Sequence, residues 1–213
     1  MRAKYPSTPH LPFSPGLQND DRLIQTLSEL EGSDVVVTEK MDGENTTMYN
    51  DHIHARSLDS RNHSSRNWVK KLWGNVAYQI PEGWRVCGEN LYAQHSITYD
   101  DLVSYFYAFS VWDSNNVALG WDDTVRFLDT LGMTGLHHVP VLYRGIFDLK
   151  VLKDLSKSIN RERVEGFVVR VSDPVPYDEF DLKFAKWVRK GHVQTSDHWA
   201  HQIIIPNKLR NSE

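Results

Sequence analysis

The chain has 213 residues, of which 40% are hydrophobic and 24% are charged, and its formal net charge is −4. This composition is typical of a globular protein that is long enough to bury a substantial core without disulfides. The single cysteine, Cys87, excludes an internal disulfide. No apolar stretch approaches the roughly 18 residues that span a bilayer, and the amino terminus lacks the apolar centre of a signal peptide. We therefore expect a cytoplasmic protein with no membrane partner.

The charge is distributed unevenly along the chain. Residues 1–140 carry 11 lysines and arginines against 18 aspartates and glutamates, whereas residues 141–213 carry 13 against 10. A protein that binds nucleic acid non-specifically is usually basic overall, and this chain is not. A polyanion would therefore meet a local basic patch, which the carboxy-terminal third is best placed to provide.

The chain shows no repeat, low-complexity tract or linker. We therefore expect one domain over residues 1–213, with no separate carboxy-terminal domain. Prolines crowd its beginning and predict an extended arm over residues 1–18. After the arm, a capping residue and the spacing of apolar side chains predict a helix over residues 19–30, closed by Gly32.

Strands and helices then follow one another irregularly. We predict helices over residues 67–79, 121–131 and 148–158, and strands over residues 35–38, 46–49, 52–57, 85–92, 105–113, 138–145, 165–171 and 180–189. The strands mostly come as hairpin-like neighbours. This order favours an antiparallel α+β fold over a doubly wound parallel sheet.

One short stretch places a lysine where two strands meet. The β-branched run 35–38 predicts a buried strand that ends on Glu39 and Lys40, and the dipeptide Asp42-Gly43 favours a turn before the strand at 46–49. Lys40 would then lie at the mouth of a hairpin. A lysine held in this way can do covalent chemistry when its pKa is lowered. The alternative is an ordinary Asp-Gly hairpin with a solvated lysine beside it.

Several short motifs follow this lysine in a fixed order. Lys40-Met-Asp-Gly43 resembles the nucleophile motif of the covalent nucleotidyltransferases, the superfamily of ATP-dependent ligases and capping enzymes. Five further segments resemble the later motifs of that superfamily and follow in the same order: Arg56-Ser57, Gly88-Glu89, Phe106-Tyr-Ala-Phe109, Glu165-Gly-Phe-Val-Val-Arg170 and Phe184-Ala-Lys-Trp-Val-Arg189. The resemblance spans residues 35–190 and is closest to the RNA ligases typified by the bacteriophage enzyme that seals nicks in double-stranded RNA.

The resemblance implies a fold and a nucleophile. The fold is an α+β nucleotidyltransferase domain, ATP-grasp-like, with two packed and mainly antiparallel sheets and flanking helices. Lys40 would attack the α-phosphorus of ATP to form lysyl-AMP, and Lys186 would bind the α-phosphate. Lys186 and a divalent cation would lower the pKa of Lys40. Asp42 would orient Lys40 or hold water around the metal.

The resemblance also implies a nucleotide-binding set. Phe109 would stack on adenine, with Phe106 or Tyr107 as alternatives, and Glu89 would accept hydrogen bonds from the ribose. Glu165 would face Mg²⁺ or Mn²⁺ largely through water, because these hard cations prefer oxygen ligands. The full set is Glu39, Lys40, Arg56, Glu89, Phe109, Glu165, Lys183 and Lys186, in which Arg56 touches the AMP phosphate or the RNA 3′-OH end.

The function implied is that of an ATP-dependent RNA ligase, which passes AMP to an RNA 5′-phosphate and seals that end to a 3′-OH. The alternatives are a DNA ligase, a GTP-using capping guanylyltransferase, or a catalytically silent nucleic-acid-binding relative. Three features depart from the family. Position 110 is serine where an acidic residue is common, and Arg170 replaces the usual lysine after the fourth motif. The last motif has one lysine in register, so that Lys190 would share the face of Lys186 while Lys183 points away. Only 23 residues follow Lys190, so a protein partner or the arm would help to grip the RNA.

Overall fold

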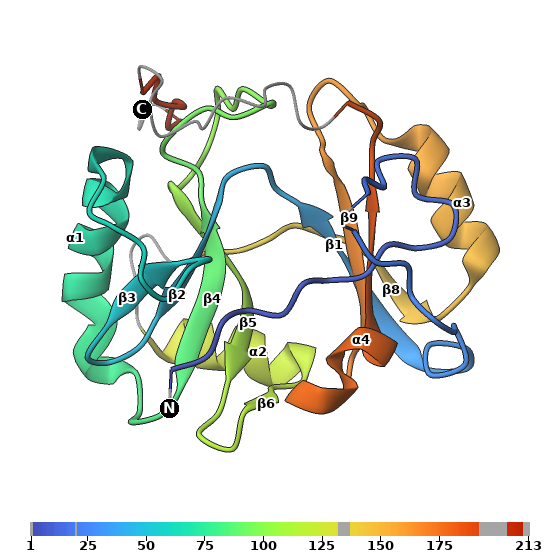
Figure 1. Ribbon diagram of the computed structural model, residues 1–213, viewed down its shortest axis with the longest axis horizontal. Helices are drawn as coiled ribbons and strands as arrows, with labels where there is room; N and C mark the ends of the chain where they lie inside the picture. The colour runs from blue at the N-terminus through green and yellow to red at the C-terminus, as the bar shows by residue number, and fades with distance from the viewer. Residues whose placement is uncertain (1, 20, 132–136, 192–203, 211–213) are drawn as a thin grey trace.

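The computed structural model describes residues 2–19, 21–131, 137–191 and 204–210, and its architecture is α+β (Figure 1). The first sheet has the strand order β11 (Phe184–Val188), β9 (Gly166–Val171), β1 (Asp34–Lys40) and β8 (Val141–Ile146), and its neighbours are antiparallel. These strands carry long β-branched and aromatic runs, which suits strands buried within a sheet. The predicted α+β class with mainly antiparallel sheets is confirmed.

The second sheet faces the first. Its strand order is β10 (Val175–Pro176), β6 (Val117–Ala118), β5 (Phe106–Trp112), β4 (Arg85–Asn90), β2 (Glu44–Met48) and β3 (Ile53–Ala55), and β7 (His137–His138) pairs with β5 in the parallel direction. Buried side chains from both sheets, such as Val35, Val169 and Trp112, share one core cluster. This shared core holds the two sheets together.

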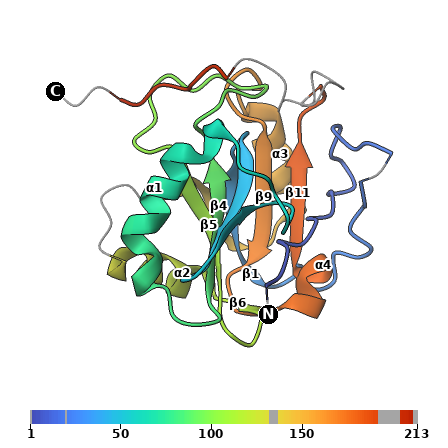
Figure 2. The same ribbon diagram turned by 60° about the vertical axis from the view of Figure 1, so that its left-hand side comes forward.

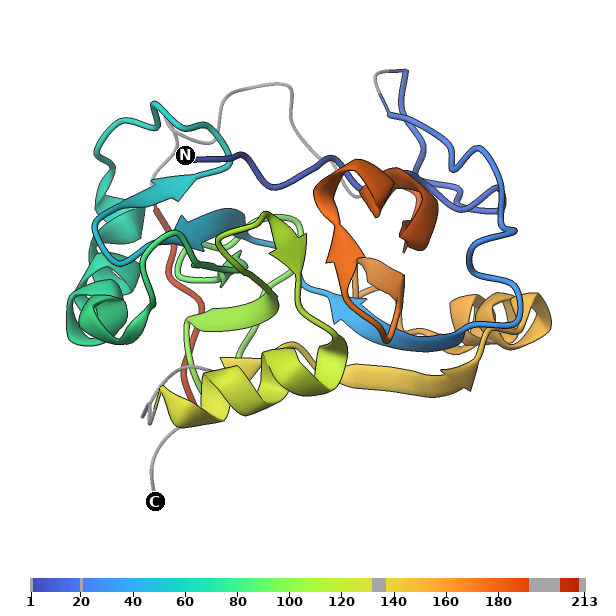
Figure 3. The same cartoon turned by 90° about the horizontal axis from the view of Figure 1, so that it is seen from below.

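The helices flank the sheets. They are α1 (Asn67–Val76), α2 (Trp121–Thr130), α3 (Leu149–Ser158) and the short α4 (Phe180–Lys183), with 3₁₀ turns at Ser64–Arg66, Ala77–Gln79 and Tyr177–Glu179. Figure 1 shows α1 outside the second sheet and α3 outside the first. Figure 3, which shows the molecule from below, places α2 between α1 and α3. None of the helices in the described ranges is long and apolar enough to cross a bilayer.

Two predicted elements are wrong. Residues 21–30 form turns and a single β-bridge at Leu23, not a helix, because the backbone there pairs with the arm: His10 donates to the carbonyl of Arg22, and Ile24 donates to the carbonyl of His10. The strand predicted over residues 180–189 begins at Phe184, because residues 180–183 form α4. In residues 21–30 a tertiary contact overrides the local pattern.

The predicted hairpin at Lys40 is also wrong. β1 pairs with β8 and β9, whereas β2 pairs with β3 and β4 of the other sheet. The Asp42-Gly43 turn therefore carries the chain across from one sheet to the other. Lys40 lies at the point where the two sheets face each other.

The amino-terminal arm carries no helix and lies along the edge of the first sheet (Figure 2). Its backbone adds to β11, because Lys186 donates to the carbonyl of Pro9 at 2.8 Å and Leu11 donates to the carbonyl of Lys186 at 2.8 Å. The Ser14 hydroxyl accepts a hydrogen bond from the Val188 amide at 2.9 Å. These contacts cover a strand edge that would otherwise present unpaired backbone groups.

Candidate active site

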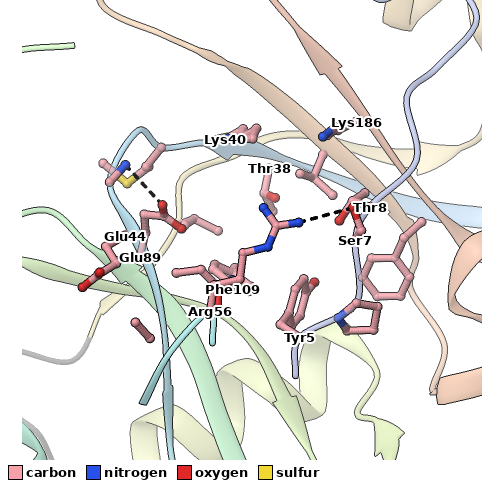
Figure 4. A pocket seen from close by; sticks show the side chains of 18 of the residues that line it. Tyr5, Ser7, Thr8, Thr38, Lys40, Glu44, Arg56, Glu89, Phe109 and Lys186 are labelled. Atoms are coloured by element: carbon pink, nitrogen blue, oxygen red, sulfur yellow. Dashed lines mark hydrogen bonds between the residues drawn. The ribbon is translucent and has the colours of Figure 1, made fainter. Parts of the chain in front are cut away.

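A cavity of about 540 Å³ opens between the two sheets, and most of the sequence-predicted site residues line it (Figure 4). Of the predicted set, it is lined by Glu39, Lys40, Arg56, Glu89, Phe109 and Lys186. The arm, the two sheets and the crossing turn all contribute to its wall. This size and concavity suit a small organic ligand.

Lys40 ends β1 inside this cavity, and its Nζ atom donates a hydrogen bond to Oε2 of Glu165. The Glu165 side chain is 5% exposed and the Lys40 side chain 28%. Burial acts to lower the pKa of Lys40, but the negative charges of Glu165, Glu89 and Asp42 outweigh it and hold the pKa above its ordinary value. The sequence predicted that Lys186 and a divalent cation would lower this pKa, and the protein groups by themselves raise it.

Two glycines let the strands that carry these groups approach closely. A Cβ atom at Gly166, next to Glu165, would lie 2.0 Å from the carbonyl oxygen of Trp187 on β11. A Cβ atom at Gly43 would lie 2.5 Å from the carbonyl oxygen of Asn90 at the end of β4. Real Cβ atoms do not tolerate such contacts. Glycine at position 166 therefore lets β9 pack against β11 within the first sheet, and glycine at position 43 lets the crossing turn approach the end of β4.

Glu89 lies on β4 and faces the same lysine. Its Oε1 atom accepts a hydrogen bond from the Gly43 amide at 3.2 Å. Burial raises the pKa of Glu89 from the ordinary 4.5 to about 8; Lys40 opposes this rise, and the charges of Glu165 and Asp42 add to it. Glu89 therefore keeps its proton at neutral pH in the folded protein.

Asp42 is buried but does not line the cavity. Its Oδ2 atom accepts hydrogen bonds from the Ser96 hydroxyl at 2.6 Å and from the Ile97 amide at 2.8 Å, and its own amide donates to the Tyr99 hydroxyl at 2.9 Å. The carboxylate therefore holds the segment after β4 against the crossing turn. Its predicted role beside the lysine or a metal stays a prediction.

Lys186 reaches the cavity from β11, and its Nζ atom pairs with Oδ1 of Asp21 at 3.0 Å. Burial lowers the pKa of Lys186; Asp21 opposes that effect, and the positive charges of Lys40 and Arg56 add to it. Asp21 also lies 3.1 Å from Nε2 of the buried His10. The sequence reasoning missed Asp21, and only the arm's pairing with β11 brings it here.

The opposite end of the cavity is apolar. Phe109 lines it, whereas the alternatives Phe106 and Tyr107 are 0% and 8% exposed and do not. Tyr5 of the arm packs against Phe109 with ring centroids 4.9 Å apart. Val168 and Arg170 of β9 also line the cavity, and burial lowers the pKa of Arg170 to about 10. Tyr5 was missed because nothing in its local sequence marks it, and Val168 lies in a quoted motif but was given no role.

The remaining predicted residues divide into two groups. Arg56 follows β3 and crosses the cavity towards the arm, where its Nη2 atom lies 3.5 Å from the Ser7 hydroxyl (Figure 4). Glu39 lines the cavity, and burial raises its pKa. Lys183, by contrast, lies on α4, pairs with Glu179 and does not line the cavity. The exposed Lys190 does not line it either.

The donor set suits a hard divalent cation held mainly through water. The described residues contain no group of three or more His, Cys, Asp or Glu side chains arranged to hold a metal. However, Glu165 and Glu89 face one lysine, and burial, with a smaller contribution from the charges of Glu165 and Asp42, raises the pKa of Glu89. Carboxylate oxygens with added water are the ligands that Mg²⁺ and Mn²⁺ prefer.

Comparisons with solved structures show the same fold. An RNA ligase from Naegleria gruberi solved with PPi is 21% identical with a TM-score of 0.56, and the match covers 87% of this chain and 57% of that one. An archaeal ATP-dependent RNA ligase is 15% identical with a TM-score of 0.59, covering 87% and 48%. A putative ATP-dependent DNA ligase from Aquifex aeolicus is 19% identical with a TM-score of 0.53, covering 87% and 50%.

A mutant of the Naegleria gruberi RNA ligase has also been solved with ATP and Mn, and it matches at 19% identity with a TM-score of 0.52, covering 87% of this chain and 58% of that one. The present chain thus spans roughly half to three fifths of the length of these ligases. A search among curated proteins found no match.

The match to a family is independent of these structures. The profile of the RNA ligase family matches residues 33–188, which include every motif from the Lys40 stretch to β11. The chain belongs to the RNA ligase family.

Proposed function

We propose that the protein is an ATP-dependent RNA ligase whose covalent intermediate is AMP on Lys40. The observation that carries the proposal is the position of Lys40, at the end of a buried strand, inside a cavity and bonded to a buried carboxylate. A surface lysine would have neither the cavity nor the fixed direction. A lysine placed in this way can act as a nucleophile once its amine has lost a proton.

In the first step, Nζ of Lys40 forms a bond to the α-phosphorus of ATP. The bond from that phosphorus to the bridging oxygen breaks, and pyrophosphate leaves with the electron pair. The amine must lose a proton, and Glu165 already accepts a hydrogen bond from it. Lys186 lines the same cavity and would stabilise the negative charge that develops on the phosphate.

Glu165 would hold Mg²⁺ or Mn²⁺, largely through water. When bound there, the cation supplies positive charge that offsets the surrounding carboxylates and lowers the pKa of Lys40. The Naegleria gruberi ligase solved with ATP and Mn supports a nucleotide with a divalent metal.

The two later steps complete the ligation. An RNA 5′-phosphate oxygen attacks the lysyl-AMP phosphorus, so that the amine leaves and an AMP-capped RNA end forms. A 3′-OH then attacks the 5′-phosphorus of that end, forms the phosphodiester and releases AMP. A protein partner that helps to grip the RNA remains part of the proposal.

The similar structures leave open that the substrate of this protein is DNA and not RNA. The DNA ligase from Aquifex aeolicus is about as similar in fold as the RNA ligases are, and the RNA ligase profile favours RNA. A silent binding relative is disfavoured, because Lys40, Glu89 and Lys186 converge on one cavity.

The test is covalent labelling. Incubation with α-labelled ATP and Mg²⁺ or Mn²⁺ should label the protein, and Lys40→Ala should abolish the label. Lys157→Ala, a matched change at an exposed lysine, should leave it intact. A label that persists in Lys40→Ala would overturn the nucleophile assignment, and a label from GTP alone would indicate a capping enzyme. Sealing assays on nicked RNA, RNA–DNA hybrid and DNA then identify the polynucleotide.

A further inference from the structure

The amino-terminal arm forms part of the wall of the nucleotide cavity. Four consecutive arm residues, Tyr5 to Thr8, line it. The arm is fixed there by its backbone pairing with β11 on either side of Lys186 and by the Tyr177 hydroxyl, which lies 3.4 Å from the carbonyl oxygen of Lys4. A segment anchored in this way presents its side chains in defined positions.

Tyr5 is held by three aromatic rings. Its ring meets Phe109 edge-on with centroids 4.9 Å apart and an interplanar angle of 71°. It also packs edge-on against Phe180 and Trp112, at 5.5 Å and 6.2 Å between centroids. Such edge-to-face contacts fix both the place and the tilt of the ring. Tyr5 therefore closes the end of the cavity beside the ring proposed to stack on the base.

The Tyr5 hydroxyl is available to a ligand. Figure 4 shows the side chain pointing into the cavity, and none of the hydrogen bonds between the residues that the structure describes uses this hydroxyl. Burial raises the pKa of Tyr5 above its ordinary value, so the phenol stays protonated and can both donate and accept.

A second group at this end of the cavity also has unused hydrogen-bonding capacity. Arg170 is 2% exposed, and its Nη1 atom lacks a hydrogen-bond partner among the described residues, although Nη2 donates to the Leu119 carbonyl at 2.6 Å. Buried polar groups are normally paired, so this end of the cavity is built for a ligand with polar atoms on its edge. A purine ring has apolar faces and such an edge.

We propose that Tyr5 is a nucleobase-contacting residue, whose ring closes the base end of the cavity beside Phe109 and whose hydroxyl hydrogen-bonds the edge of adenine. This inference rests on the proposed use of ATP, and it makes the arm part of the nucleotide site. The competing interpretation is that Tyr5 only packs the arm against the core.

The test compares a ligand with a base and a ligand without one. Binding of ATP and of inorganic tripolyphosphate is measured by equilibrium titration in a Lys40→Ala background, where no adduct can form. Tyr5→Phe removes one oxygen and keeps the ring packing. It should weaken ATP binding about threefold to tenfold, the effect of one lost hydrogen bond, and leave tripolyphosphate binding unchanged. Tyr78→Phe, at a tyrosine that is 81% exposed, should change neither.

Tyr5→Ala should weaken ATP binding further, and thermal unfolding reports whether this variant still folds. Unchanged ATP binding in Tyr5→Phe would overturn the inference, as would an equal loss for tripolyphosphate, because that loss would mean a displaced arm. If the wild-type chain binds ATP but is never labelled, the covalent mechanism fails while the Tyr5 contact is still decided by these titrations. A wild-type chain that does not bind ATP overturns both.

Discussion

The Nζ atom of Lys40 donates a hydrogen bond to Oε2 of Glu165, and this contact joins the end of β1 to the residue before β9. The two residues are 125 positions apart in the sequence. The pair presents a lysine that is aimed at the cavity but held in its charged form. The free-energy barrier of the first step must therefore include the cost of removing that proton from Lys40.

The first prediction concerns the charge of Glu165. Glu165→Gln keeps a hydrogen-bond acceptor but removes the negative charge that raises the pKa of Lys40. The neutral amine then appears at lower pH. The pH of half-maximal lysine adenylylation, measured at saturating Mg²⁺, should fall by about 1 unit or more. Glu162→Gln, at an exposed neighbour, should leave the profile in place. An unmoved profile in Glu165→Gln would show that another group sets the pKa.

The second prediction concerns stability and pH at Glu89. Its pKa is about 8 in the folded protein against an ordinary 4.5, so the folded state keeps a proton that the unfolded state has lost. Stability should therefore fall as the pH rises from about 4.5 to 8. Glu89→Gln should remove this decline and be more stable than wild type at pH 8 by at least about 1.4 kcal/mol, the equivalent of one pKa unit. Urea unfolding at pH 5 and pH 8 measures both; parallel curves for wild type and variant would contradict it.

The third prediction concerns the contact between β9 and β11. Gly166→Ala would place a Cβ atom 2.0 Å from the Trp187 carbonyl oxygen, so the two strands must move apart. We expect a loss of roughly 3 kcal/mol or more in the free energy of unfolding, because the clash is with backbone.

The matched control for this change is Gly74→Ala. Gly74 lies inside α1 with open space around it, and alanine there should stabilise the protein by about 0.5–1 kcal/mol. Thermal or urea unfolding measures both variants. Equal effects at the two glycines would show that the strand contact is less tight than described.

The fourth prediction separates two roles for Asp42. Its carboxylate accepts hydrogen bonds from Ser96 and Ile97, so Asp42→Asn should destabilise the protein by about 1–2 kcal/mol through weaker charge-assisted bonds. The Mg²⁺ concentration that supports half-maximal adenylylation should stay the same. A raised Mg²⁺ requirement with unchanged stability would instead assign Asp42 to the metal.

Much of the fold could be predicted from local pattern. The β-branched run of β1 and the aromatic run of β5 predict strands, and the apolar spacing in α1 and α3 predicts helices, because each of these elements buries one continuous face. The motifs also contain six of the residues that line the cavity, which are Glu39, Lys40, Arg56, Glu89, Phe109 and Lys186.

The failures share one cause, which is contact between distant segments. The pairing of β1 with β8 and β9, and not with β2, depends on strands more than 100 residues away. The backbone of residues 21–24 is used by the arm, so the apolar spacing there does not form a helix. Asp21 and Tyr5 reach the site only through the same arm. Local periodicity carries no information about such partners.

The pairing of the arm with β11 has a consequence for assembly of the protein during synthesis. Ser14 and Val188, which bond to each other, are separated by 174 positions, so the arm leaves the ribosome long before its partner strand. Closing so long a loop is slow compared with forming local structure. The wall that Tyr5 contributes to the cavity would be among the last parts to form, and a nascent chain would expose Lys40 before it could hold a nucleotide.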